Sequence, residues 1–94
     1  MRVKLSPRAR QDLQDLVRYI ARDSPSNARL VRERIKDAVQ QLRAHPDSGR
    51  RGRVEGTREL VIPRTGYIAA YQAVNGSIES AAIIHEAQEW PTDL

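Results

Sequence analysis

The residues of this sequence best suited to acid–base chemistry are one histidine, His85, and a set of arginines. His85 lies in "IIHEAQEWP" at positions 83–91, where an apolar stretch passes into a polar tail that contains the only tryptophan, Trp90. A nuclease that activates the RNA 2′-hydroxyl needs a general acid or base and cations for the charged transition state. His85 could supply the first, and Arg58 and Arg64 the second. These three are the candidate catalytic residues if the protein is a nuclease.

The surroundings of His85 in the sequence favour a structural role instead. No tyrosine or second histidine follows it, and no lysine occurs beyond Lys36. A lone histidine without neighbouring acid–base partners is more often a satisfied structural residue than a catalyst. We therefore expect a neutral, partly buried imidazole beside Trp90, and we assign no catalytic residue.

An arginine-rich stretch, "GRRGR" at 49–53, is the clearest candidate for binding an anion. Its charge is suited to phosphate, but a solvated arginine loop fits the same pattern. Aromatic residues that would stack on bases are scarce nearby, which weakens direct recognition of a single strand. Trp90-Pro91 is interpreted as a cover on the core, with a partner anchor as the alternative.

Length and composition limit the possible classes. The 94 residues suffice for one domain, 1–94, with a thin core. Sixteen lysines and arginines against twelve acidic residues give a net charge of +4, which favours acidic partners. The absence of cysteine excludes disulfides and thiolate metal sites, and we expect neither metal nor cofactor. No apolar run is long enough to span a membrane, so we expect a cytoplasmic protein with no membrane contact.

The helices and strands that position these residues are predicted from helix-start residues and from the spacing of apolar residues. "RVKL" alternates as a short strand, and Ser6-Pro7 and Ser24-Pro25 each combine an N-cap with a first-turn proline. Apolar residues at helical spacing follow both, so we predict a helical hairpin whose second helix runs over 25–44. Arg8 and Asp12 are predicted to form an i,i+4 pair on the first helix. The fold class is α+β, with the hairpin packed on a small antiparallel sheet.

The C-terminal half is predicted to supply that sheet. "RELVI" and "YIAAYQAV" are strands, and Asn75-Gly76 favours a tight hairpin to the strand "SIESAAIIH". A two-residue loop aligns four pairs: Val74 with Ser77, Tyr71 with Ser80, Ile68 with Ile83, and Tyr67 with Ile84. Both faces of this hairpin are then apolar, although one helical hairpin covers only one face. We favour burial of the second face by a partner, and the alternative is coverage by the arginine loop and the tail around Trp90.

Motifs along essentially the whole chain resemble the RelE/ParE superfamily of toxins from bacterial toxin–antitoxin pairs. The most specific are "GTRELVIPRTGYIAAY" and the closing His-x-x-x-x-Trp-Pro, which, with the opening "LSPRARQDLQDLVRYIA", are most similar to the ParE branch. The resemblance implies a cognate antitoxin that lies across the groove and sheet surface. It also implies one of two activities: RelE-like members cut mRNA in the ribosome, and ParE-like members poison DNA gyrase without being nucleases.

The leading interpretation is a ParE-like gyrase inhibitor held inactive by an antitoxin. The alternatives are a RelE-like, ribosome-dependent mRNA endonuclease, and an inactive binding module. The third is considered because Gln72 and Gln88 stand where ParE-like relatives often carry arginine. The predicted antitoxin-binding residues are Leu60, Ile62, Tyr67, Tyr71, Ile78 and Ile84. The predicted target-binding residues are Arg50, Arg51, Arg53, Arg58 and Trp90.

Overall fold

Two antiparallel helices and a five-stranded sheet make up the fold, which a computed structural model describes for residues 2–91. The helices are α1 (Pro7–Ala21) and α2 (Pro25–Gln40), followed by a 3-10 turn, Gln41–Arg43. The strands are β1 (Arg2–Leu5), β2 (Arg50–Arg51), β3 (Arg58–Val61), β4 (Tyr67–Val74) and β5 (Ser77–His85). None of the helices within 2–91 is long and apolar enough to cross a bilayer.

The helical hairpin confirms the reading of the two Ser-Pro pairs. The hydroxyl of Ser6 accepts a hydrogen bond from the Ala9 amide at 3.0 Å, and that of Ser24 accepts from the Asn27 amide at 3.1 Å. Each bond satisfies an amide that the first helical turn leaves free. The second helix ends in the 3-10 turn rather than continuing as α-helix to residue 44, since the last turn tightens before Pro46.

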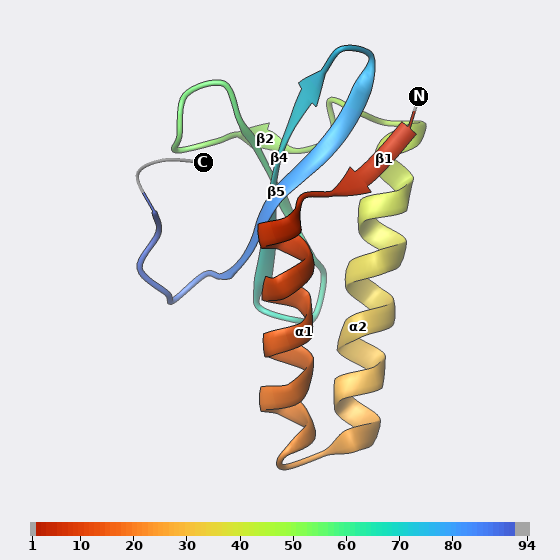
Figure 1. Ribbon diagram of the computed structural model, residues 1–94, viewed down its shortest axis with the longest axis vertical. Helices are drawn as coiled ribbons and strands as arrows, with labels where there is room; N and C mark the ends of the chain where they lie inside the picture. The colour runs from red at the N-terminus through yellow and green to blue at the C-terminus, as the bar shows by residue number, and fades with distance from the viewer. Residues whose placement is uncertain (1, 92–94) are drawn as a thin grey trace.

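The sheet is mixed rather than wholly antiparallel. Its strand order is β1-β5-β4-β3-β2, and β1 runs parallel to β5 while the other pairs are antiparallel. Both helices pack on one face, as Figure 1 shows. The main core lies between them and is formed by Ala9, Leu13, Leu16, Val31, Ile35, Val39, Ile62, Ala69 and Ile83.

A β-bulge corrects the predicted register of the β4–β5 hairpin. The pairs Val74–Ser77 and Tyr71–Ser80 form as expected, but the register shifts between Ala70 and Tyr71. Beyond the shift Ile68 lies opposite Ile84, and Tyr67 lies opposite His85, so the predicted Ile68–Ile83 and Tyr67–Ile84 pairs are wrong. One inserted residue moves the following side chains to the other face of the strand. Ile83 therefore joins the helix-side core, and Ile84 lies on the opposite face with Ile68.

The start of α1 holds this bulge in place. The amide of Ser6 donates to the Ser80 carbonyl and its hydroxyl donates to the Ala81 carbonyl, both at 2.9 Å. The carboxylate of Asp12 accepts from the Ile83 amide at 3.0 Å, on the part of β5 that β1 does not pair. The expected Arg8–Asp12 pair does not form between these described residues, because the Asp12 side chain is turned to the strand.

Removing this carboxylate is expected to destabilise the edge of β5. Asp12→Ala leaves the Ile83 amide without its acceptor, which should lower the free energy of unfolding by about 1–2 kcal/mol. Asp12→Asn retains a side-chain oxygen and should recover at least half of the loss. Urea denaturation measures both values, and hydrogen exchange at Ile83 locates the effect. Unchanged exchange at this amide in Asp12→Ala would contradict the assignment.

The second face of the sheet is covered by the chain itself, which corrects the preferred prediction of an open face. Ile68, Ala70, Ala82 and Ile84 are at most 2% exposed in the isolated chain. In Figure 1 the loop around β2 and the C-terminal tail lie away from α2. Because a pleated strand places alternate side chains on opposite faces, these residues need a cover that the helices do not provide. The self-coverage alternative is the one that the structure supports.

Candidate functional site

The loop between the helical hairpin and β3 is organised around a buried acid, Glu59. Its side chain is 3% exposed, and its position opposite Ala70 places it on the face that the loop covers. Arg50 donates from Nε and Nη2 to Oε1 at 3.1 and 2.9 Å. Arg53 donates from its amide and its Nε to Oε2 at 2.8 and 3.1 Å. One carboxylate thus holds two of the predicted target-binding arginines.

The ionisation of Glu59 is coupled to these contacts. Burial raises the pKa of the Glu59 carboxyl, but hydrogen bonds from the Arg53 amide, the Arg53 side chain and the Arg50 guanidinium lower it more. The net pKa lies below the ordinary value of 4.5. Hydrogen bonds and opposite charges favour the ionised form, so the carboxylate stays charged near neutral pH.

The same loop holds the C-terminal tail. The Arg53 guanidinium carbon lies 3.8 Å from the centroid of the Trp90 ring, a cation–π contact. Trp90 is half-buried, and its Nε1 is buried with no hydrogen-bond partner among the described residues. We name Arg50, Arg53, Glu59 and Trp90 the Glu59 cluster. It joins the loop to the tail and accounts for three of the five predicted target-binding residues.

The remaining two, Arg51 and Arg58, are directly opposite each other on β2 and β3. Arg58 donates to the Gly49 carbonyl at 2.8 Å, and its Nη2 lies 3.7 Å from the Asp47 carboxylate. Arg51 forms no ion pair or side-chain hydrogen bond with residues 2–91. Like charges opposite each other in a sheet are unfavourable, and an anionic partner relieves the repulsion.

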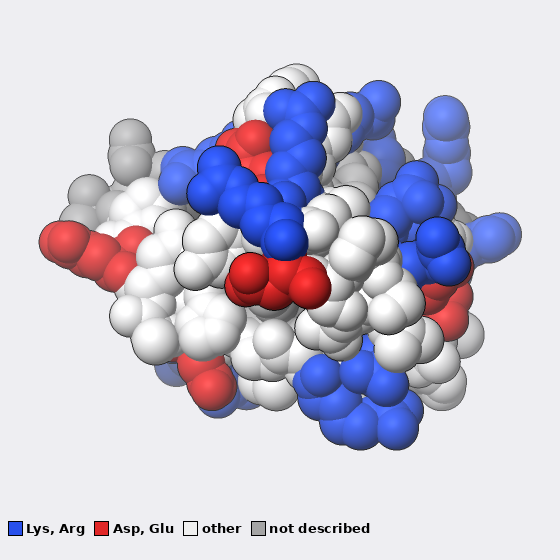
Figure 2. Space-filling view, turned by 90° about the horizontal axis from the view of Figure 1, so that it is seen from below, with Lys and Arg blue, Asp and Glu red and all other residues white. Residues whose placement is uncertain are grey.

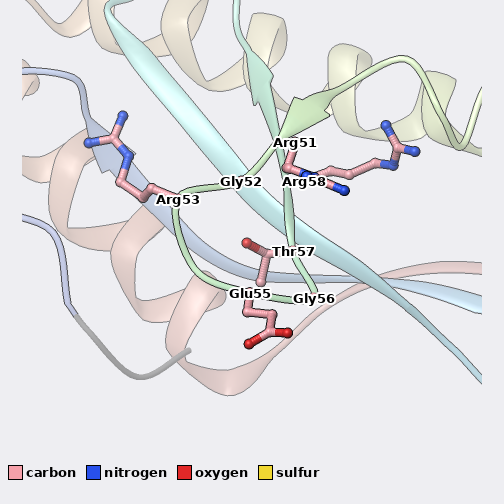
Figure 3. Close-up of a pocket in the computed structure, with 7 residues that line it drawn as sticks. All are labelled: Arg51, Gly52, Arg53, Glu55, Gly56, Thr57 and Arg58. Atoms are coloured by element: carbon pink, nitrogen blue, oxygen red, sulfur yellow. The ribbon is translucent and has the colours of Figure 1, made fainter.

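The hollow beside this pair is not a convergent anion pocket. It has a volume of about 530 Å³ and is bordered by the loop over 51–58. Figure 3 shows the Arg53 side chain on one side of the loop and the Arg51 and Arg58 side chains on the other. Figure 2 looks at the opposite end of the molecule, the end with the α1–α2 turn, where the basic side chains also lie in separate groups. The Arg53 side chain therefore does not converge with those of Arg51 and Arg58 on one phosphate.

His85 is held by its neighbours, as the structural interpretation predicts. Its Nδ1 accepts from the Ala87 amide at 3.1 Å, and its own amide donates to Gln88 Oε1 at 3.2 Å. The ring packs edge-to-face on Tyr67 with the centroids 5.1 Å apart. The neighbouring aromatic ring is thus Tyr67 and not Trp90, whose indole lies against Arg53.

Arg58 and His85, two of the three candidate catalytic residues, do not converge. Arg58 is opposite Tyr71 and His85 is opposite Tyr67, four positions apart along β4. At about 3.3 Å per residue this separation is roughly 13 Å along the strand alone. Arg64 lies in the turn before β4 with φ of 62°, where its carbonyl accepts from Arg34 at 3.4 Å beside α2.

The predicted antitoxin-binding residues are mostly interior. Ile62, Tyr71, Ile78 and Ile84 are at most 2% exposed, and Leu60 and Tyr67 are half-buried. An open surface that contains Tyr71, Ile78 and Ile84 is therefore absent from the isolated chain, while the role of the six residues in antitoxin binding stays a prediction. Large apolar side chains that are exposed include Tyr19, Leu30, Val61 and Val74.

Tyr71 has a structural role that sequence reasoning missed. Its hydroxyl donates to the Pro46 carbonyl at 2.7 Å and accepts from the Gly49 amide at 2.9 Å. Leu42 and Ile78 bury its ring in a second small cluster. Tyr71 therefore anchors the start of the arginine loop. Among residues 2–91 no group of three acidic or histidine side chains is arranged to hold a metal ion.

Comparisons with known proteins place these features in one family. Residues 3–90 match the family model described as the ParE toxin of type II toxin–antitoxin system, parDE. The chain is 38% identical over 93 residues to Y4kP of Sinorhizobium fredii, named as a candidate toxin, covering 99% of this chain and 96% of that protein. It is 34% identical over 88 residues to Toxin RelE3 of Caulobacter vibrioides, covering 92% and 95%.

A solved structure shows the same fold. A chain of the chromosomal ParDE toxin–antitoxin system from P. aeruginosa superposes with a TM-score of 0.81 at 25% identity. The match covers 90% of this chain and 95% of that one.

Proposed function

Because this chain belongs to the ParE family of toxins from type II toxin–antitoxin systems, we propose that it inhibits DNA gyrase, without cutting RNA, and that a cognate antitoxin neutralises it. The observation that carries the choice of a non-nuclease is the environment of His85. Its Nδ1 is engaged by the Ala87 amide, and its ring is fixed against Tyr67.

A general acid–base mechanism requires more than one histidine. The cation that stabilises the developing charge must reach the same phosphate as the proton-transfer group. Arg58 lies far along the sheet from His85, and Arg64 lies in a hollow beside Arg34 and Asp37 of α2. This arrangement supports a toxin that acts by binding.

The target contact proposed here is carried by Arg51 and Arg58. Both are exposed, and they lie side by side on β2 and β3. Guanidinium groups bind carboxylates and phosphates in planar, two-bond geometry, so either an acidic protein surface or DNA phosphate suits the pair. Arg50, Arg53 and Trp90 support this surface by holding the loop in shape.

The antitoxin contact proposed here is carried by Leu60 and Tyr67. Both are half-buried, and they lie on the helix side of the sheet, where they pack against the main core. The four other members of the predicted set are at most 2% exposed: Ile62, Tyr71, Ile78 and Ile84. They contribute by shaping the fold and not by direct contact.

Two assays on one pair of proteins test the activity. The purified wild type is expected to shift gyrase reactions toward cleaved DNA and to leave ribosome-bound mRNA intact. His85→Gln should behave like the wild type, because glutamine supplies an acceptor for the Ala87 amide and a structural histidine costs about 1 kcal/mol at most. A catalytic acid or base would instead contribute about 10²–10⁴-fold in rate. mRNA cleavage by the wild type that the folded His85→Gln variant lacks would establish the RelE-like alternative.

The proposed target surface has its own control. Arg51→Gln with Arg58→Gln should reduce gyrase-dependent DNA cleavage about tenfold or more, since both charges are lost from one contact. Arg29→Gln with Arg32→Gln removes two exposed arginines of α2, the same change in net charge, and should leave cleavage unchanged. Equal effects of the two changes would show that net charge alone, and not this surface, drives the activity.

A further inference from the structure

A surface hollow of about 270 Å³ lies between α1, the strands β4 and β5, and the C-terminal tail. Asp12, Asp15 and Tyr19 line it from α1, Tyr67 from β4 and Gln88 from the tail. The spacing of the three α1 residues, i, i+3 and i+7, places their side chains on one face of the helix. Leu16 and Ile83 complete the lining with apolar atoms.

The charge of this hollow is opposite to that of the protein. The chain carries a net charge of +4, and arginine or lysine lines four further hollows, around the arginine loop, α2 and Tyr71. The hollow beside α1 contains only acidic charged residues, Asp12 and Asp15. The hollow is therefore locally acidic on an otherwise basic molecule.

Each of the two carboxylates has one oxygen available. Oδ2 of Asp12 accepts from the Ile83 amide at 3.0 Å, and Oδ1 of Asp15 accepts from Gln11 Nε2 at 2.8 Å. The second oxygen of each forms no hydrogen bond with residues 2–91. The bond to the Ile83 amide orients the Asp12 carboxylate, so a bound cation would not have to order that side chain.

Two tyrosines add aromatic surface to the same hollow. Tyr19 is 67% exposed in the last turn of α1, although a large aromatic side chain is usually covered. Tyr67 is fixed by the edge-to-face contact with His85. Burial, and next the nearby Tyr19 phenol, raise the pKa of Tyr67, so its hydroxyl stays neutral. Neutral tyrosine rings attract cations through their faces.

We propose that this hollow accepts an arginine side chain of the cognate antitoxin. A guanidinium group is planar, remains charged, pairs with carboxylates and stacks on aromatic rings, whereas an ammonium group offers no flat face. The antitoxin is the occupant because the hollow includes Tyr67, one of the two residues proposed above for the antitoxin contact. This inference therefore rests on the proposed function.

The test compares antitoxin affinity among matched variants of the full chain. Asp15→Asn should weaken binding about tenfold by removing one carboxylate charge, and Tyr19→Ala should weaken it about threefold by removing the aromatic wall. Both positions are exposed, so both variants should remain folded. Glu33→Gln, an exposed acid of α2 outside this hollow, is the control and should bind like the wild type.

A small probe examines the hollow without the antitoxin. Nα-acetyl-arginine amide at millimolar concentration should shift the ring resonances of Tyr19 and Tyr67, and Nα-acetyl-leucine amide should not. Asp15→Asn should remove the arginine-specific shift. Equal shifts with both amides would overturn the assignment of a cation site.

The outcomes separate this inference from the proposed function. Antitoxin binding that is unchanged in Asp15→Asn and Tyr19→Ala overturns the inference and leaves the antitoxin partnership intact. A folded wild type that does not bind the antitoxin refutes the partnership itself. Self-association of the wild type that Asp15→Asn abolishes, measured by sedimentation without antitoxin, would instead assign the hollow to a second copy of this chain.

Discussion

Ile84→Asp is expected to destabilise the isolated chain strongly at neutral pH. Ile84 is 2% exposed and lies opposite Ile68 on the face that the loop and tail cover. An unpaired carboxylate at this position loses its hydration and the apolar packing of isoleucine, which together should cost about 4 kcal/mol or more. Native domains have only about 5–15 kcal/mol of stability, so this loss is a large fraction of the total. Far-UV circular dichroism and urea denaturation measure the loss.

Val61→Asp is the matched control. Val61 lies on β3 opposite Ile68 but is 47% exposed, so a carboxylate there remains hydrated. We expect a change of less than about 1 kcal/mol. If Ile84→Asp keeps its helical signal and its urea midpoint, the second face is open in solution and the cover is not part of the stable fold. Loss of antitoxin binding in an Ile84 variant is otherwise a consequence of unfolding.

A charged substitution at Tyr71 is also expected to destabilise the fold. Its ring is 1% exposed and its hydroxyl bridges Pro46 and Gly49, so Tyr71→Asp removes buried packing and two hydrogen bonds together. Its effect on an antitoxin complex cannot be separated from its effect on the fold. Substitutions at half-buried Leu60 and Tyr67 give the cleaner test of a direct contact.

The helical hairpin could be predicted because its signals are local. Each helix begins with a serine whose hydroxyl bonds an amide three residues ahead and with a proline that fits the first turn. The apolar residues then follow at helical spacing. The Asn75-Gly76 turn is equally local, and both residues have positive φ, as a tight hairpin requires. Contacts within a few residues therefore fixed these elements.

The β-bulge could not be predicted because its causes are distant. The stretch "ESAAII" contains no glycine or proline to mark an irregularity. The bulge is held by Ser6, 75 residues from Ala81, and by Asp12, 71 residues from Ile83. One inserted residue exchanged the faces of Ile83 and Ile84. The predicted assignment of these two side chains to the two faces of the sheet was therefore reversed.

The sequence also did not reveal which arginines of the loop pair with an acid and which face outward, because the pairing depends on how the chain folds. Arg50, Arg51, Arg53 and Arg58 look equivalent in "GRRGRVEGTRE", which also contains two acidic residues. The alternation of β3 places Glu59 under the loop, where it pairs with Arg50 and Arg53. The position of Glu59 within a predicted strand could have indicated this pairing, because a buried acid in a strand is rarely found without a cation beside it.

Glu59→Gln is expected to loosen both the loop and the tail. Glutamine of the same size has a single acceptor oxygen and no charge, so it leaves Arg50 and Arg53 poorly paired. Because both arginines remain half-exposed and can regain water, we expect a loss of about 2–3 kcal/mol, less than for a fully buried pair. Trp90 is the only tryptophan, so its fluorescence should report the weakened Arg53 contact directly.

The pH dependence gives this prediction a definite sign. The pKa of Glu59 is lower in the folded chain than its ordinary value of 4.5, so its ionised form stabilises the fold at any pH above that value. The contribution is lost as the pH falls through the lowered, folded-state pKa. The difference in unfolding free energy between wild type and Glu59→Gln should therefore be constant near neutrality and narrow in acid. Glu55→Gln, an exposed acid of the same loop, should show neither the loss nor the narrowing. A difference between wild type and Glu59→Gln that is as large at pH 3 as at pH 7 would show that shape, and not charge, holds the loop.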